Sequence, residues 1–187
     1  METEPIIYFY DKETEFVKKE HIFLNNFEPS PFVDENGLTY KTNEHYYQCH
    51  KFDNVSDSLI FKNAFDEIRT AETADKCKKL ARKYENEILK GKWQFKKWND
   101  DKYKDRIMKR GLIFKFSQNI DMLNALVATK GFKLVERSEK DDYWGGFLPN
   151  SKNMLGAMLM ELRDNYLQTH TVFINGSGLN PVEVPKA

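Results

Sequence analysis

TNEHYYQCHKF, residues 42–52, packs a glutamate, two histidines, two tyrosines, a cysteine and a lysine into eleven positions. Thr42 is a suitable N-cap, and the pattern after it predicts a helix. On a period of 3.6 residues one face of this helix holds four side chains, Glu44, Tyr47, Gln48 and Lys51. Another face holds Tyr46, Cys49, His50 and Asp53, and either face is a candidate wall of a polar pocket. The alternative is that Glu44 is an ordinary first-turn acid, favoured by the helix dipole, on a solvated helix.

The composition indicates one domain with a heavily charged surface. The chain has 187 residues, of which 40% are hydrophobic and 31% are charged, and its formal net charge is zero. A blanket electrostatic attraction to nucleic acid is therefore not supported, although a local basic patch is compatible with this balance. Aromatic residues reach 14%, an excess that favours pockets and stacking surfaces.

Cysteine and histidine usage argues against a metal protein. Two cysteines, Cys49 and Cys77, make neither a disulfide framework nor a convincing zinc site. His45 and His50 lack the i, i+4 spacing of a helical zinc pair, so we expect no metal and no cofactor. No apolar run approaches the roughly 18 residues of a membrane span, and the acidic N-terminus does not resemble a signal peptide. We expect an intracellular monomer with no membrane partner, in the cytoplasm or alternatively the nucleus.

Helical patterns predominate from residue 43 to 130, with short extended segments on both sides. IIYFY (6–10) and FKLVE (132–136) are typical of strands. Asn36-Gly37 between FV and LTY predicts a hairpin. The expected fold class is therefore α+β and predominantly helical, a single compact domain with a few short β-strands.

Two cations, Lys78 and Arg82, lie four residues apart on a predicted helix, beside a buried stripe of Cys77 and Ala81. Like charges at this spacing are mildly unfavourable in an isolated helix. A ligand phosphate, or an acid from another segment, would relieve them. A lysine beside further cations and an apolar stripe is also a candidate amine nucleophile. The alternative is a solvated basic face.

Trp98 and Trp144 lie in polar, loop-like surroundings, where flat side chains can stack on a heterocyclic base. Asp141 and Asp142 precede Trp144, and Glu136 lies a few residues earlier. Together with Glu44 they are candidate acid–base carboxylates. The alternative for Asp141 is a solvated loop acid. The sequence contains no GxGxxG, phosphate-loop, GxSxG or HExxH motif.

Seven strings occur in order between about residue 20 and residue 167: FLNNFEPSPF, GLTYKTNEHYYQCHKF, KCKKLAR, KKWNDDKYKDRIM, KFSQN, LVERSEKDDYWGG and NMLGAMLMELR. Together they resemble the NADAR family, the YbiA-like N-glycosidases. The resemblance implies a YbiA-like catalytic domain over residues 21–167. Residues 1–20 would form an N-terminal extension with a short strand, and residues 168–187 a C-terminal tail.

The resemblance also implies a function. The expected enzyme is an N-glycosidase that removes ADP-ribose from guanine in ADP-ribosylated DNA, so its partner is ADP-ribose or ADP-ribosylated nucleic acid. Two alternatives stay open: a hydrolase of riboflavin-pathway ribosylaminopyrimidine phosphates, and an ADP-ribose-binding module without turnover. Lys92, Lys96 and Lys97 favour DNA, whereas the neutral net charge opposes it.

Carried over position by position, the resemblance implies catalytic roles for Glu44, Lys78, Trp98, Asp141 and Trp144. It implies substrate binding by Asn26, Tyr47, Arg82, Asn119, Gly145 and Asn153. In one route the lysine attacks C1′ of the ribose, and in the other a carboxylate stabilises an oxocarbenium-like state or orients water. Ala81 stands where the family often has glycine, so Lys79 is the alternative to Lys78. Ser151-Lys152 replaces a glycine-rich approach to Asn153.

Overall fold

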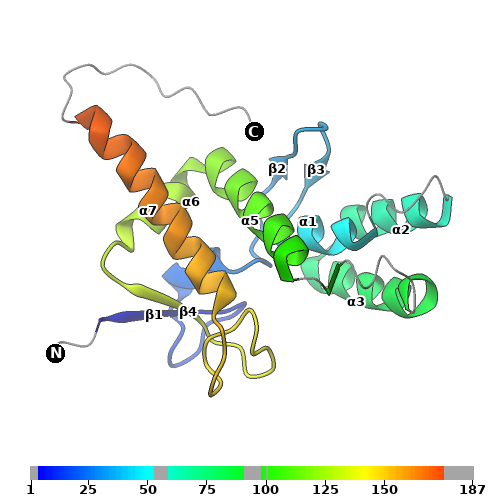
Figure 1. Ribbon diagram of the computed structural model, residues 1–187, viewed down its shortest axis with the longest axis horizontal. Helices are drawn as coiled ribbons and strands as arrows, with labels where there is room; N and C mark the ends of the chain where they lie inside the picture. The colour runs from blue at the N-terminus through cyan, green and yellow to red at the C-terminus, as the bar shows by residue number, and fades with distance from the viewer. Residues whose placement is uncertain (1–3, 53–58, 91–97, 100, 175–187) are drawn as a thin grey trace. The chain divides into compact units, whose positions relative to one another are not determined.

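The computed structural model describes residues 4–52, 59–90, 98–99 and 101–174. They belong to two compact units, coloured by position along the chain in Figure 1. Unit 1 comprises described residues of 1–28 and 119–187, and unit 2 comprises described residues of 29–118.

Unit 2 combines a hairpin with helices. Its strands are β2 (Phe32–Val33) and β3 (Thr39–Tyr40), and its α-helices are α1 (Asn43–Cys49), α2 (Leu59–Thr70), α3 (Ala74–Tyr84) and α5 (Asp101–Gln118). A 3₁₀ turn, η2 (His50–Phe52), follows α1, and a π-helical turn, η3 (Glu85–Leu89), follows α3. Helix α1 packs against α2, α3 and α5 and is therefore central to this unit.

The predicted hairpin is confirmed. Phe32 lies opposite Tyr40 in an antiparallel pair. The Asp34 carboxylate accepts hydrogen bonds from the backbone N–H groups of Asn36 and Leu38, each at 2.9 Å. Gly37 has φ of 78°, a conformation that glycine adopts without steric cost. The turn chemistry of the sequence thus sets the register of the two strands.

Unit 1 joins a parallel strand pair to helices. Strand β1 (Ile6–Phe9) pairs with β4 (Lys133–Glu136), with Ile6 opposite Lys133 and Phe9 opposite Glu136. The helical elements are η1 (Lys19–Leu24), α6 (Ile120–Ala128) and α7 (Met154–Ile174). Helix α7 packs on α6 and β4.

Buried Arg163 of α7 ties that helix to the segment between α6 and β4. Its Nη1 donates to the carbonyl oxygens of Thr129 and Phe132 at 2.8 and 2.9 Å. Helix α7 also continues through residues 168–174, the first part of the expected tail, and residues 175–187 lie outside the described ranges.

The fold class expected from the sequence is confirmed, since helices predominate and the strands are few and short (Figure 1). Within the described residues, no helix is both long enough and apolar enough to cross a membrane.

Two buried tyrosines of unit 2 provide a matched test of its core. The rings of Tyr40 and Tyr46 meet edge-on with centroids 5.0 Å apart. The Tyr40 hydroxyl donates to Asp34 Oδ2 at 3.0 Å, whereas the Tyr46 hydroxyl is buried without a hydrogen-bond partner among the described residues. The two tyrosines are therefore equally buried, but only the Tyr40 hydroxyl has a hydrogen-bond partner among the described residues.

We expect Tyr40→Phe to lower the free energy of unfolding by about 1–3 kcal/mol, because the buried Asp34 loses a donor. Tyr46→Phe removes a desolvated hydroxyl that has no such partner, so it should leave stability within about 0.5 kcal/mol or raise it. Urea denaturation followed by circular dichroism measures both values. Equal losses in the two variants would contradict this account.

Candidate functional site

Helix α1 is buried along its whole length, which overturns the solvated-helix alternative for Glu44. Glu44 and Gln48 are each 5% exposed. Glu44 Oε1 accepts a hydrogen bond from Gln48 Nε2 at 2.7 Å. Because a buried carboxylate is costly unless it is bonded, this bond fixes an acid group inside unit 2.

His45 braces the same helix. Its Nε2 lies 3.1 Å from the carbonyl oxygen of Ala71, and its Nδ1 lies 2.8 Å from Thr42 Oγ1. A carbonyl only accepts, so Nε2 carries the proton and Nδ1 accepts from the Thr42 hydroxyl. Burial lowers the pKa of His45, which favours this neutral form. His45 therefore joins the start of α1 to the residue after α2.

Across the ranges that the structure describes, no group of three or more His, Cys, Asp or Glu side chains is arranged to hold a metal ion.

An aromatic and cationic cluster adjoins Glu44 on α1. The rings of Tyr47 and Trp98 have centroids 4.9 Å apart, and Tyr103 meets Trp98 edge-on at 5.8 Å. Lys51 Nζ lies 5.7 Å from the centroids of both Tyr47 and Trp98, and it forms an ion pair with Glu85 of η3. Helix α1 thus presents an acid and one aromatic ring, and Trp98 and the Lys51 cation of η2 lie beside that ring.

The loop-like setting expected for Trp98 is wrong. Trp98 is helical and 5% exposed. Its indole is held between Tyr47 and Tyr103, and this aromatic packing explains the burial. Residues 92–97, which include the three lysines that favoured DNA, lie outside the described residues.

Helix α3 packs on α1 through Cys77, the residue before the predicted nucleophile Lys78. Cys77 Sγ lies 3.8 Å from the backbone oxygen of Glu44. Burial raises the pKa of the Cys77 thiol, the charge of Glu44 raises it further, and Lys51 acts in the opposite direction. Glu44 and Lys51 therefore both act on the same thiol. Lys78 directly follows Cys77 and is exposed, and Arg82 is exposed one turn later.

In unit 1, four predicted residues meet in the loop between β4 and α7: Asp141, Trp144, Gly145 and Asn153. Asp141 Oδ1 accepts from the backbone N–H groups of Tyr143 and Trp144 at 2.9 and 2.8 Å. The Trp144 ring meets Tyr143 edge-on with centroids 5.1 Å apart. One carboxylate oxygen of Asp141 thus holds the turn that presents two half-buried aromatic rings.

Asn153 and Gly145 shape the same loop. Asn153 has φ of 52°, its Oδ1 accepts from the Glu136 N–H at 3.2 Å, and its Nδ2 donates to the Leu134 oxygen at 2.8 Å. A Cβ at Gly145 would lie 2.5 Å from the Asp141 carbonyl oxygen, so only glycine fits there. Both residues therefore have a structural role, whatever they contact in a substrate.

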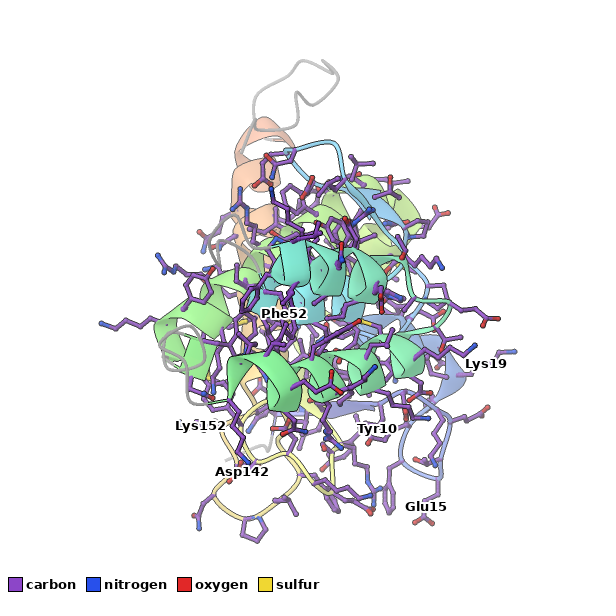
Figure 2. The ribbon with its side chains drawn as sticks, turned by 90° about the vertical axis from the view of Figure 1, so that its right-hand side faces the viewer. Tyr10, Glu15, Lys19, Phe52, Asp142 and Lys152 are labelled. Atoms are coloured by element: carbon purple, nitrogen blue, oxygen red, sulfur yellow. The ribbon has the colours of Figure 1, made fainter. Side chains whose placement is uncertain are left out.

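Lys152 occupies the position where the sequence departs from the family strings. Its N–H donates to the Asp142 oxygen at 2.7 Å, and Figure 2 shows the two residues together in the loop. Lys152 Nζ lies 4.6 Å from the centroid of the Tyr143 ring. The loop thus presents an exposed cation beside its aromatic pair.

The remaining predicted residues lie in other segments of unit 1. Asn26 is buried just after η1, and Asn119 is the N-cap residue of α6. Neither assignment came from a local pattern, because both followed from the FLNNF and KFSQN strings alone.

Sequence reasoning gave no role to two notable lysines. The sequence signal for Lys51 is its spacing of seven residues from Glu44, which predicts that the two side chains lie on the same side of the chain. Lys115 of α5 is 0% exposed, with Nζ 5.2 Å from the centroid of the Phe116 ring. No local pattern marks a lysine for burial, so Lys115 could not have been identified in this way.

Comparison with curated proteins identifies two kinds of relative. The chain is 33% identical over 168 residues to a riboflavin biosynthesis protein of Vibrio vulnificus, covering 89% of this chain and 40% of that protein. It is 34% identical over 164 residues to the chloroplastic riboflavin biosynthesis protein PYRR of Zea mays, covering 82% and 25%. The chain thus spans less than half of these two relatives. It is also 32% identical over 142 residues to N-glycosidase YbiA of Escherichia coli, covering 75% and 79%.

The fold and a family model agree with these relationships. The NMR structure of Escherichia coli YbiA superposes with a TM-score of 0.70 and 30% sequence identity, covering 91% of this chain and 90% of that chain. The model of the NADAR domain matches residues 8–167. The sequence strings, the fold and both comparisons lead to one assignment: the chain belongs to the NADAR domain family.

Proposed function

We propose that this protein is a hydrolase of N-glycosyl bonds, and that Glu44 is its central acid group. The observation that carries the proposal is the buried Glu44 carboxylate, which is bonded to Gln48 on α1. Tyr47 of the same helix contacts Trp98, and Lys51 of η2 lies near both rings. The names of its relatives, which include N-glycosidase YbiA, support the same reaction class.

The arrangement suits cleavage of a C1′–N bond. Breaking this bond develops positive charge on the ribose ring and negative charge on the departing base. A carboxylate such as Glu44 stabilises the ring or orients the attacking water. The rings of Tyr47 and Trp98 offer an apolar wall for the sugar or base. Such a wall excludes water, and this exclusion strengthens the attraction between the carboxylate and the positively charged ring.

A covalent route through Lys78 is proposed alongside direct hydrolysis. The neutral amine attacks C1′, the bond to the base breaks, and the base leaves with a proton. The opened sugar is then held as an imine, until water adds to C1′ and releases the amine. The contact of Cys77 with Glu44 supports this route, because it brings the backbone preceding Lys78 to α1.

For the substrate, we propose ADP-ribose attached to guanine in DNA. Its phosphates need a cationic partner, and Arg82 is an exposed cation that the resemblance assigns to substrate binding. We propose Asn26, Asn119, Asp141, Trp144, Gly145 and Asn153 as further residues on which activity depends.

A second candidate substrate is a ribosylaminopyrimidine phosphate. It is favoured by the names of the Vibrio vulnificus and Zea mays relatives, both of which are riboflavin biosynthesis proteins. It also needs no basic surface for DNA, in keeping with the zero net charge.

Replacement of Glu44 tests the central role of this carboxylate. We expect Glu44→Gln to lower kcat about 10²–10⁴-fold, because an amide cannot stabilise the cationic ring as a carboxylate does. Glu87→Gln, at an exposed position of η3, is the control and should keep the wild-type rate. Chromatographic release of the free base measures both. A binding module without turnover would release no base even with the wild-type protein.

Borohydride trapping tests the covalent route. Wild-type protein incubated with substrate and borohydride should gain the mass of one reduced ADP-ribose, located at Lys78 by peptide mapping. Lys78→Ala should abolish the adduct and lower the rate, whereas Lys79→Ala should retain both. An adduct at another lysine, or a Lys78→Ala variant with its full rate, would exclude Lys78 as the nucleophile.

Direct comparison of substrates tests the specificity. We expect kcat/KM to be higher on an oligonucleotide carrying ADP-ribosylated guanine than on a ribosylaminopyrimidine phosphate. Free ADP-ribose and unmodified guanine should be the products. The reverse order of rates would support the second candidate and reject the first.

A further inference from the structure

Gln48 lies one turn after Glu44 and is bonded to it in a way that fixes the orientation of its amide. Its Nε2 donates to Glu44 Oε1 at 2.7 Å. In the reversed orientation, the amide oxygen would face a carboxylate oxygen, and neither could donate. The Gln48 Oε1 is therefore an acceptor whose position is set by Glu44.

This acceptor is buried and has no hydrogen-bond partner among the residues that the structure describes. Gln48 itself is 5% exposed. Leaving a buried carbonyl oxygen without a donor costs about 1–3 kcal/mol, so a donor supplied by a ligand would be bound strongly. A ligand that reached Gln48 Oε1 with an O–H or N–H group would therefore supply a donor that the described residues do not.

We propose that Gln48 determines specificity by accepting a hydrogen bond from the 2′-hydroxyl of the substrate ribose. The inference rests on the proposed function, in which Glu44 acts at C1′. The hydroxyl adjacent to C1′ is the 2′-hydroxyl, and the acceptor adjacent to Glu44 is Gln48 Oε1. Hydrogen bonds to this hydroxyl strengthen in the transition state of glycoside cleavage, so they contribute to rate as well as binding.

The consequence is discrimination between ribose and 2′-deoxyribose. A 2′-deoxy sugar would leave the Gln48 oxygen buried without a donor, and sites built to bond a hydroxyl reject analogues that lack it. Both candidate substrates are ribosides. In DNA, the glycosidic bonds of the strand itself join bases to 2′-deoxyribose. Gln48 would therefore direct the enzyme to the attached ribose and away from the strand that carries it.

The test is isothermal titration calorimetry with ADP-ribose and its analogue lacking the 2′-hydroxyl on the ribose that was joined to the base. Binding of products avoids the different intrinsic reactivities of ribosides and 2′-deoxyribosides. We expect wild-type protein to bind the deoxy analogue about tenfold or more weakly, the effect of one hydrogen bond to a buried acceptor. Gln48→Met, of similar size but without the amide, should bind the two ligands within about threefold of each other.

Gln168→Met, the same substitution at an exposed position of α7, is the matched control and should keep the wild-type discrimination. Circular dichroism checks the fold of each variant. If Gln48→Met does not fold, the wild-type comparison alone decides, because discrimination below threefold overturns the proposal. Discrimination that persists in a folded Gln48→Met also overturns it. If wild-type protein binds neither ADP-ribose nor ribose 5-phosphate, the proposed function fails and this inference fails with it.

Discussion

The hydrogen bond between Glu44 and Gln48 lies in the interior of unit 2, because α2, α3 and α5 pack against α1. A charged group buried in that position is costly unless it is hydrogen-bonded. Thr42 caps the first turn, His45 bonds to the residue after α2, and Cys77 of α3 contacts the backbone of Glu44. The stability of the unit and the position of its acid group therefore depend on the same contacts.

Local structure was predictable wherever a few neighbouring residues decide it. The Thr42 cap, the Asn36-Gly37 turn and the shared face of Glu44 and Gln48 follow from dihedral preferences and helical period. The 3.6-residue period does not extend to Lys51, because α1 gives way to a 3₁₀ turn at His50. Burial was not predictable in this way. A helix as polar as α1 becomes buried only because residues distant in sequence pack around it, and the same applies to Trp98 and to Lys115.

The family strings include residues that support the fold, and the loop between β4 and α7 contains three of them. Asp141 holds a turn through one oxygen, Gly145 permits a close backbone approach, and Asn153 fastens the loop to β4 through both side-chain atoms. Each would be retained in a family for the shape of the loop alone. A resemblance in sequence therefore finds such residues without separating those that touch the substrate from those that support it, and only substitutions with separate readouts of folding and activity make that distinction.

The pairing of β1 with β4 has a consequence for biosynthesis. Unit 2 is one continuous stretch of chain, so its contacts can form as soon as that stretch has left the ribosome. Strand β1 emerges first, yet its ladder partner β4 is translated only after the whole of unit 2. The nascent N-terminal strand must wait with an unpaired edge, which is the state in which strands associate with the wrong neighbour. Slow translation would lengthen that wait, and a chaperone that covers short apolar segments would shield the strand until β4 arrives.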